Sequence, residues 1–330
     1  MTIINGIEID IIRYDRNIIR DAIENNEPIE DKLHVIIVIS NPCLYAKRYI
    51  LAREFINRFE KDEPNTILYI VELAYKDQKF IITDSKNERH LQLRTEVPLW
   101  HKENMINLGV KKLLPKNYKA FAWIDADLEF ENNSWALDTL KILNGTKDIV
   151  QLFSHCIDMD KNNMTMKVMN SAGYQYCKQK QFSNNGENFW HPGFAWAITR
   201  KAYEKIGGLY EFAILGSGDN IMMHCLLNNG RNSINFESTQ DYKDSIIKFE
   251  SNMKKLRFGY TPGVIRHYYH GSKKNRFYSE RWKILVFNNY SPIEYIKKDS
   301  TGLLIPTSKF PKKLKDEIYE YFASRNEDDL

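Results

Sequence analysis

Cysteine is scarce in this chain of 330 residues, and Cys43, Cys156, Cys177 and Cys225 lie far apart without a C-x-x-C pair. This spacing excludes a disulfide scaffold and argues against a structural zinc site. An excess of one charge is also missing, since 47 Lys and Arg stand against 43 Asp and Glu. A net charge of +4 is too small to predict nucleic-acid binding. With 43% hydrophobic and 27% charged residues, the composition excludes global disorder.

Long hydrophobic runs are absent as well. No apolar run is longer than the one from Val35 to Ile39, which is far short of the roughly 20 residues that cross a bilayer. The first thirty residues carry charges every few positions, so no signal peptide is visible. We therefore expect a soluble, cytoplasmic protein without a membrane span.

Three common nucleotide and hydrolase motifs are also missing. No G-x-G-x-x-G follows the first predicted strand, no G-x-x-x-x-G-K-[S/T] occurs, and there is no G-x-S-x-G. These absences argue against a classical dinucleotide fold, a P-loop and a nucleophile elbow.

The hydrophobic pattern that is present predicts an α/β fold. LHVIIVIS (33–40) and TILYIVELAY (66–75) are typical of strands buried on both faces, and apolar residues at helical spacing lie between them. Strand, helix and strand in about forty residues form a right-handed βαβ unit. We expect a mostly parallel central sheet flanked by helices, with a small antiparallel element near the active site.

The remaining pattern predicts further elements and three regions of the chain. We expect strands in 79–84, 120–130, 149–153 and 263–271, and a strand followed by a short helix in 193–208. Helices are expected in 97–113 and 236–257, and a glycine-rich turn with a helix in 211–230. Residues 158–190 suggest a loop or hairpin over a site, and after about 291 we expect no strand and a final amphipathic helix. The predicted regions are an N-terminal extension (1–30), a catalytic domain (31–290) and a C-terminal helical extension (291–330).

The strongest chemical signal is Asp125-Ala126-Asp127, which follows the apolar run 120–124. Ligands of open α/β sheets bind at the carboxyl ends of strands. Two carboxylates there, separated by a small residue, suit Mg²⁺ or Mn²⁺ bridging the protein to a diphosphate. A solvated acidic turn is the alternative interpretation.

A second signal is the glycine-flanked turn GSGDN (216–220). Asp219 lies where a helix is expected to begin, and backbone donors there favour an ionised carboxylate. Such a carboxylate can act as a general base. The alternative is that Asp219 only caps the helix.

A third signal is VIRHYYHG (264–271), followed by the basic SKKNR. In a regular strand His267 and His270 point to opposite faces, so one could bind a metal while the other packs or contacts substrate. Lys273, Lys274 or Arg276 could meet phosphates. Trp190 and His191, beside Pro192-Gly193, are candidates for a wall of the pocket.

In this order, the features resemble a GT-A glycosyltransferase of the nucleotide-diphospho-sugar transferase superfamily, over roughly residues 34–285. IDAD matches the family's D-x-D position, GFAWAITRKAYEKIGGLYEFAILGSGDNIM is similar to the family 2 and family 7 segment that carries the catalytic base, and VIRH is similar to the family 7 strand whose His completes the metal site. The whole also looks like uncharacterised glycosyltransferases of large DNA viruses, phages and some bacteria.

The resemblance implies specific roles. Asp219 is the base, while Asp125, Asp127 and His267 bind the metal. Donor contacts map onto Asn41, Glu72, Lys102, Asn104, Asn107, Asp125 and Asp127. Apart from the resemblance, the residues themselves suggest Lys273 as a further donor contact and Trp190, His191 and His270 for the acceptor side.

The expected reaction is metal-dependent transfer of a hexose-type sugar from a nucleotide-diphosphate donor, with a UDP-sugar as first choice. The acceptor is a glycan or glycoconjugate hydroxyl, and the outcome is inverting. Mn²⁺ or Mg²⁺ is the expected cofactor, and nucleic acid is not an expected partner. If the chain is viral, the host cytoplasm is its expected location. The alternatives are a retaining transferase, and a catalytically silent GT-A-like module that binds a glycan or a protein. The sequence leaves the oligomeric state open.

Overall fold

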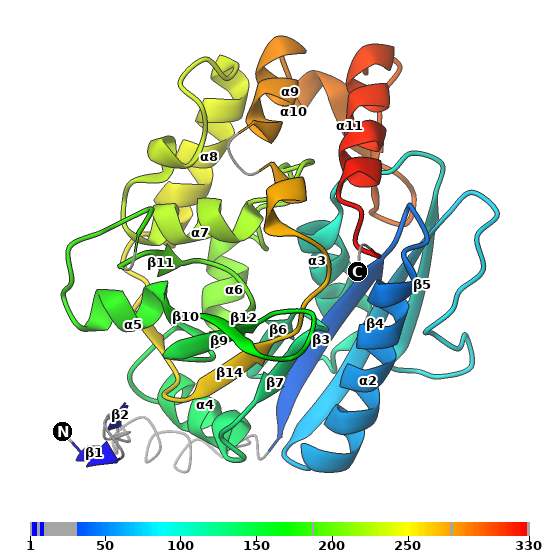
Figure 1. The fold of residues 1–330 in the computed structure, drawn as a ribbon. Helices are drawn as coiled ribbons and strands as arrows, with labels where there is room; N and C mark the ends of the chain where they lie inside the picture. The colour runs from blue at the N-terminus through cyan, green and yellow to red at the C-terminus, as the bar shows by residue number, and fades with distance from the viewer. Residues whose placement is uncertain (1, 5–6, 10–31, 187, 278–279, 329–330) are drawn as a thin grey trace.

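The structure is a computed structural model that describes residues 2–4, 7–9, 32–186, 188–277 and 280–328. Its centre is a seven-stranded sheet (Figure 1). In spatial order its strands are β13 (Phe258–Tyr260), β8 (Ile149–Gln151), β12 (Ala195–Thr199), β6 (Ala120–Ile124), β3 (Leu33–Ser40), β4 (Thr66–Tyr75) and β5 (His90–Thr95). Neighbouring strands are parallel except that β12 runs antiparallel to both β8 and β6. The expected mostly parallel α/β sheet is therefore confirmed.

A second sheet has five short strands: β11 (Trp190–His191), β10 (Thr165–Ser171), β9 (His155–Met159), β14 (Val264–His267) and β7 (Leu128–Phe130). The pairs β10–β9 and β14–β7 are antiparallel, which confirms the expected small antiparallel element. The chain passes from the first sheet to the second at residues 125–127, between β6 and β7. The predicted strand 120–130 is thus two strands in different sheets.

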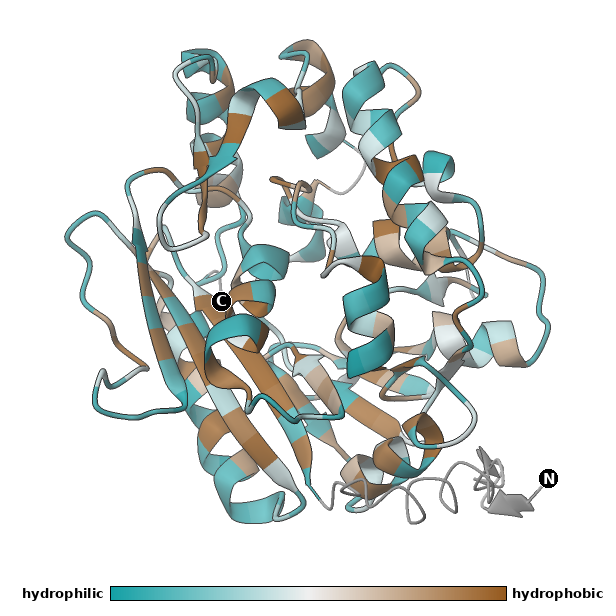
Figure 2. Cartoon of the chain, turned by 180° about the vertical axis from the view of Figure 1, so that it is seen from behind, coloured by the Kyte–Doolittle hydropathy of each residue, from teal (hydrophilic) through white to brown (hydrophobic). Residues whose placement is uncertain are grey.

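Helices cover both faces of the central sheet, because its strands are apolar on both sides (Figure 2). On β3, Val35 and Ile37 belong to one apolar cluster with residues of α2 (Ala46–Asp62) and α4 (Trp135–Leu143). The intervening Ile36 belongs to the other cluster. That cluster includes residues of α3 (Lys102–Leu113), α6 (Arg200–Ile206), α7 (Gly218–Leu226), α8 (Gln240–Met253), α9 (Arg281–Phe287) and α11 (Lys312–Ser324).

The remaining described elements are short. They are β1 (Thr2–Ile4), which pairs with β2 (Ile7–Ile9), α5 (Ala172–Cys177), η1 (Gly230–Ser233), η2 (Lys273–Arg276), α10 (Pro292–Tyr295) and the hairpin of β15 (Ile296–Lys298) with β16 (Leu304–Pro306). The rest of the predicted extension 1–30 lies outside the described residues. The three predicted regions stay a prediction.

Besides the strand 120–130, four sequence-based expectations about elements were wrong. Residues 79–84 form a loop instead of a strand, because the Glu72 carboxylate binds its backbone amides. The helix expected from 97 begins at Lys102. The strand expected over 263–271 ends at His267. Strands do follow residue 291, but β15 and β16 have three residues each, too few for an alternating pattern to be seen.

No helix in the part of the chain that the structure describes is long and apolar enough to cross a membrane.

Candidate functional site

The site lies where the chain leaves the central sheet. All five residues of β6 are buried, and β6 ends just before Asp125, whose backbone N–H donates to the Phe194 carbonyl at 3.0 Å. Two residues later, the Asp127 carbonyl accepts the backbone N–H of Tyr268 at 2.9 Å. This bond ties the start of β7 to the segment that follows β14.

Three potential metal ligands meet at this crossing: Asp127, His267 and His270. One ligand atom from each lies within 4.8 Å of the other two. The Asp127 Oδ2 is 3.0 Å from Nε2 of His270 and 3.8 Å from Nε2 of His267. The second oxygen, Oδ1, is buried and has no hydrogen-bond partner among the described residues. A buried carboxylate oxygen without a partner is costly, and a cation would satisfy it.

Each of the two imidazoles also has a carboxylate on its other side. The His267 Nδ1 lies 2.7 Å from Oδ1 of Asp158, its neighbour in the parallel β14–β9 register. The His270 Nδ1 faces Oε2 of Glu327 at 3.7 Å. Both carboxylate side chains are 1% exposed. This pattern, with a carboxylate behind each imidazole, is common around metal-binding histidines, because it fixes the ring and raises its basicity.

The sequence-based view that His267 and His270 face opposite sides was wrong. Alternation holds only within a strand, and β14 ends at His267. The chain then turns, with Gly271 at a positive φ of 87°. As a result His270 lies in the same cluster as His267 instead of on the opposite face.

Basic side chains surround the cluster. The Lys273 Nζ contacts Asp158 Oδ2, and the Arg276 guanidinium lies 2.8 Å from Nε2 of His270. Burial raises the pKa of Asp127, but the neighbouring charges of His267 and His270 outweigh burial and hold it below its usual range. Burial also raises the pKa of Asp158, but hydrogen bonds from His267 and Lys273 outweigh burial and lower it.

The other aspartate of the D-x-D pair, Asp125, is not one of these three ligands. Asp125 forms an ion pair with Lys102 at the first residue of α3. Lys102 also lines a pocket with Asp219, Glu103, Trp123 and six further residues: Phe194, Trp196, Leu209, Tyr210, Gly218 and Met222. The pocket encloses about 10 Å³, room for roughly one water molecule. A sugar ring can enter only if side chains of the wall move.

Two carboxylates line that pocket, from α7 and α3. Asp219 is in the first turn of α7, and its Oδ1 accepts the backbone N–H of Asn220 at 2.8 Å. Glycines make room for both: a Cβ on Gly193 would lie 2.7 Å from Asp219 Oδ2, and one on Gly218 would lie 2.3 Å from Glu103 Oε1.

The pKa values of Glu103 and Lys102 are both raised, for different reasons. Burial raises the pKa of Glu103 to about 8, although the nearby Lys102 lowers it. Burial lowers the pKa of Lys102, but Asp125, Asp219 and Glu103 outweigh burial and raise it. The pocket therefore combines a permanent cation with a carboxyl group that takes up protons near neutral pH.

Two residues predicted to contact the donor serve the fold in this structure. The Asn41 side chain closes its own turn through Tyr45, donating to its carbonyl at 2.8 Å and accepting its N–H at 2.9 Å. The Glu72 carboxylate accepts the backbone N–H groups of residues 81–83 and the hydroxyl of Thr83. Their contact with a nucleotide stays a prediction.

The same holds for the two asparagines of α3. Asn104 donates to Glu211 at 2.8 Å and accepts the N–H of Leu304 at 3.0 Å. Asn107 donates to the carbonyl of Leu209 at 2.9 Å and accepts its N–H at 2.8 Å. These bonds fasten α3 to the segments around residues 209 and 304.

The predicted acceptor wall lies beside the histidine cluster. Trp190 is 3% exposed, and its Nε1 has no hydrogen-bond partner among the described residues. The His191 ring stacks on Phe194 with centroids 4.1 Å apart, and Phe194 in turn lies 4.6 Å from the His267 ring. Burial lowers the pKa of His191 to about 3.

Sequence reasoning missed Asp158, Glu103 and Glu327. Asp158 stands in a strand without a motif, and Glu103 looks like an ordinary acidic residue in the first turn of a helix. Glu327 belongs to the acidic NEDDL, which suggests a solvated end, yet this residue is 2% exposed. The burial is explained by Arg48, whose guanidinium donates to both carboxylate oxygens of Glu327. Because Arg48 is far from Glu327 in the sequence, no local pattern could reveal this pairing.

No protein-family model matches the chain, and no curated protein does. Solved structures similar in fold include the mannosyltransferase PcManGT from Pyrobaculum calidifontis in complex with GDP-Man and Mn²⁺. It is 11% identical over 93% of this chain and 76% of that chain, with a TM-score of 0.42. Another is a mutant of Drosophila β1,4-galactosyltransferase 7 in complex with manganese, UDP-Gal and xylobiose. It is 9% identical over 84% of this chain and 93% of that chain, with a TM-score of 0.40.

The catalytic domain of that Drosophila enzyme, in complex with xylobiose, is 9% identical to this chain, with a TM-score of 0.34. The match covers 70% of this chain and 64% of that domain, so this chain spans just under two thirds of the length of that domain. A third similar protein is the 4-diphosphocytidyl-2C-methyl-D-erythritol synthase of Anaerococcus prevotii, with 12% identity, 89% and 96% coverage and a TM-score of 0.32. Two glycosyltransferases and one 4-diphosphocytidyl-2C-methyl-D-erythritol synthase are therefore among the solved structures to which this chain is similar.

Proposed function

We propose that this chain is a metal-dependent glycosyltransferase that moves a sugar from a nucleotide-diphosphate sugar to an acceptor hydroxyl. The observation that carries the proposal is the set of three potential metal ligands, Asp127, His267 and His270. Its members offer one carboxylate and two imidazole nitrogens within 4.8 Å of one another, and Asp127 Oδ1 lacks a partner among the described residues. Buried carboxylates behind both imidazoles support the same interpretation.

The chemistry of these three metal ligands also indicates which metal binds. Mg²⁺ prefers oxygen ligands, whereas imidazole nitrogen suits transition metals. Two imidazoles beside one carboxylate therefore favour Mn²⁺ over Mg²⁺. We propose His270 as a ligand beside Asp127 and His267, whereas Asp125, paired with Lys102, contacts the donor. A divalent cation bound there would neutralise the charge that develops on the leaving diphosphate.

The remaining chemistry belongs to residues of the pocket. Asp219 accepts the proton of the acceptor hydroxyl while the oxygen of that hydroxyl bonds to the anomeric carbon. The bond between that carbon and the diphosphate oxygen breaks, and its electron pair leaves with the diphosphate. Lys102, which pairs with Asp125 and lines the same pocket as Asp219, keeps positive charge beside the reacting centre. The basic Lys273 and Arg276 stand on the metal side, where the phosphates would lie.

A thermal-shift and donor-hydrolysis screen tests the proposal. The protein is incubated with UDP-, GDP- and CMP-sugars, each with Mn²⁺, with Mg²⁺ and without metal. We expect one donor to raise the melting temperature and to be hydrolysed slowly, in both cases only with metal. No shift and no hydrolysis with any pair would contradict the proposal.

Variants and products sharpen that screen. Asp127→Asn should abolish the metal-dependent shift, while Asp77→Asn, which replaces an exposed aspartate of the loop after β4, should keep it. Binding of a donor without turnover would instead support the silent binding module. A product that retains the anomeric configuration of the donor would remove Asp219 as base and support a retaining transferase.

A further inference from the structure

We propose that Glu327 is a positioning residue of the metal site, holding His270 in its ligand orientation from a segment near the end of the chain. The inference rests on the proposed function, since it takes Asp127, His267 and His270 as metal ligands. It concerns the segment Arg325–Asp328, called here the closing segment, which follows α11.

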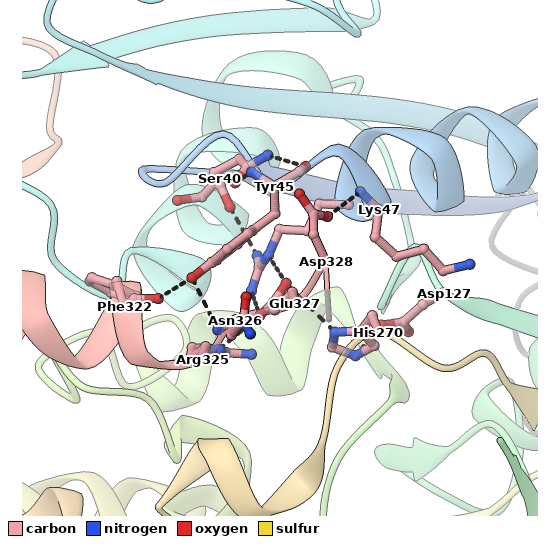
Figure 3. Close-up of polar contacts among 12 residues, drawn as sticks. Ser40, Tyr45, Lys47, Asp127, His270, Phe322, Arg325, Asn326, Glu327 and Asp328 are labelled. Carbon is pink, nitrogen blue, oxygen red and sulfur yellow. Dashed lines mark hydrogen bonds and ion pairs between the residues drawn. The ribbon is translucent and has the colours of Figure 1, made fainter. Parts of the chain in front are cut away.

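The first step is the placement of Glu327 behind His270 (Figure 3). The imidazole turns Nε2 toward Asp127, 3.0 Å away, and Nδ1 toward Glu327 Oε2, 3.7 Å away. His267 lies in the same way between Asp127 and Asp158. Both imidazoles thus have a carboxylate on the Nδ1 side and turn Nε2 toward Asp127. Asp158 is at hydrogen-bond distance from His267, 2.7 Å, whereas Glu327 is at ion-pair distance from His270. The Arg276 Nη2 lies 3.3 Å from Nδ1 and 2.8 Å from Nε2 of His270.

The second step is that the Glu327 carboxylate is itself fixed. Its side chain is 1% exposed. Arg48, on α2, donates from Nη2 to Oε1 at 2.7 Å and from Nε to Oε2. Arg325 Nε adds an ion pair with Oε1 at 2.7 Å. Arg48 also donates to the Ser40 carbonyl at the end of β3, at 2.9 Å. The position of Glu327 is therefore set by the central sheet.

The third step is that the closing segment is docked on both sides. The Asp328 carboxylate accepts the backbone N–H groups of Ala46 and Lys47, at 2.9 and 2.8 Å, at the start of α2. The Tyr45 hydroxyl donates to the Ala323 carbonyl at 2.7 Å and accepts the Asn326 N–H at 3.1 Å.

On the other side, the closing segment packs directly on the loop that carries His270. A Cβ on Gly271 would lie 2.9 Å from the Glu327 Cα. The absence of a side chain at Gly271 therefore permits the close approach. The loop has the positive φ of glycine at that point, so the position suits glycine for two independent reasons.

Calorimetric titration with Mn²⁺ alone, without a donor, measures the contribution of Glu327. Glu327→Gln should weaken Mn²⁺ binding by about 10- to 100-fold, as losses behind metal-binding histidines do. Glu327→Asp keeps the charge beside Arg48 but withdraws it from His270, and should give an intermediate affinity. The matched control Glu320→Gln makes the same change at an exposed glutamate of α11, outside the closing segment, and should leave the affinity unchanged. Melting curves show that each variant is folded.

A double-mutant cycle separates positioning from general loosening. If Glu327 acts through His270, Glu327→Gln should have little further effect on Mn²⁺ affinity in a His270→Ala background. Equal effects in both backgrounds, or wild-type affinity in Glu327→Gln and Glu327→Asp, would overturn the inference while leaving the metal site intact. Wild-type protein that binds no Mn²⁺ would overturn the metal site and the inference together.

Discussion

The His267 Nδ1 lies 2.7 Å from Oδ1 of Asp158, its neighbour across two parallel strands of the small sheet. Because strand pairing sets this contact, the ring is held by the fold itself rather than by a flexible loop. Its Nε2 is then left facing Asp127. The sheet therefore orients one of the proposed metal ligands without the help of a metal.

Replacing the buried carboxylate behind His267 should weaken metal binding. Asp158→Asn removes the charge that orients the ring, so we expect Mn²⁺ affinity to fall by about 10- to 100-fold in calorimetric titration. Asp160→Asn, two residues further on in the turn after β9, is the matched control and should bind Mn²⁺ like the wild type. Equal affinities of the wild type and Asp158→Asn would contradict the role of Asp158.

Removing the proposed base should stop transfer without affecting donor binding. General base catalysis contributes about 10²- to 10⁴-fold to a rate, so Asp219→Asn should lower kcat by that order. In this variant the Kd of the donor with Mn²⁺, measured by calorimetry, should stay within a few-fold of the wild-type value. The control Asp244→Asn on α8 should keep both kcat and the donor Kd within a few-fold of wild type. Turnover at the wild-type rate in Asp219→Asn would remove the base assignment.

A methyl group at Gly193 should displace the same carboxylate. The added Cβ would lie 2.7 Å from Asp219 Oδ2, and a shift of about 1 Å at a reacting group can cost about 10²-fold in rate. Gly193→Ala should therefore lose most transfer activity but bind Mn²⁺ normally. Loss of Mn²⁺ binding in this variant would show that the pocket and the metal site are not separate.

The raised pKa of Glu103 predicts how stability depends on pH. The buried carboxyl group, with a pKa of about 8, keeps its proton in the folded state at pH values where the unfolded chain has released it. The folded state therefore binds more protons between the ordinary pKa of Glu and about 8, and stability must fall as pH rises through that window.

Chemical denaturation at pH 5 to 8 tests this dependence. In the wild type, the free energy of unfolding should fall with pH at a slope that approaches about 1.4 kcal/mol per pH unit, the value for one proton. Glu103→Gln should lack this contribution to the slope. Glu280→Gln, a matched change of a glutamate in the segment before α9, should keep the wild-type slope. Parallel curves for the wild type and Glu103→Gln would contradict the shift.

The sequence predicted the central elements well and the site only in part. β3 and β4 were found with their bounds because uninterrupted β-branched runs have few other interpretations. Short strands such as β15 and β16 were missed, because three residues carry no period. The break between β6 and β7 was missed as well, since apolar residues continue on both sides of it.

For the candidate site, Asp127 and His267 stood out because a motif surrounds each. His270 was assigned to the acceptor side, because the assumption of a regular strand hid the turn after His267. Asp158 and Glu327 could not be found from local pattern. Their roles arise from strand register and from an ion pair with Arg48, and both bring together residues that are distant in the chain.

The most direct test of the central claim is the anomalous scattering of Mn²⁺ in crystals of this protein soaked with the metal. We predict one strong peak at bonding distance from Oδ of Asp127 and from Nε2 of both His267 and His270, and its absence in Asp127→Asn crystals. A peak bound by other residues, or no peak in the wild type at saturating Mn²⁺, would contradict the account.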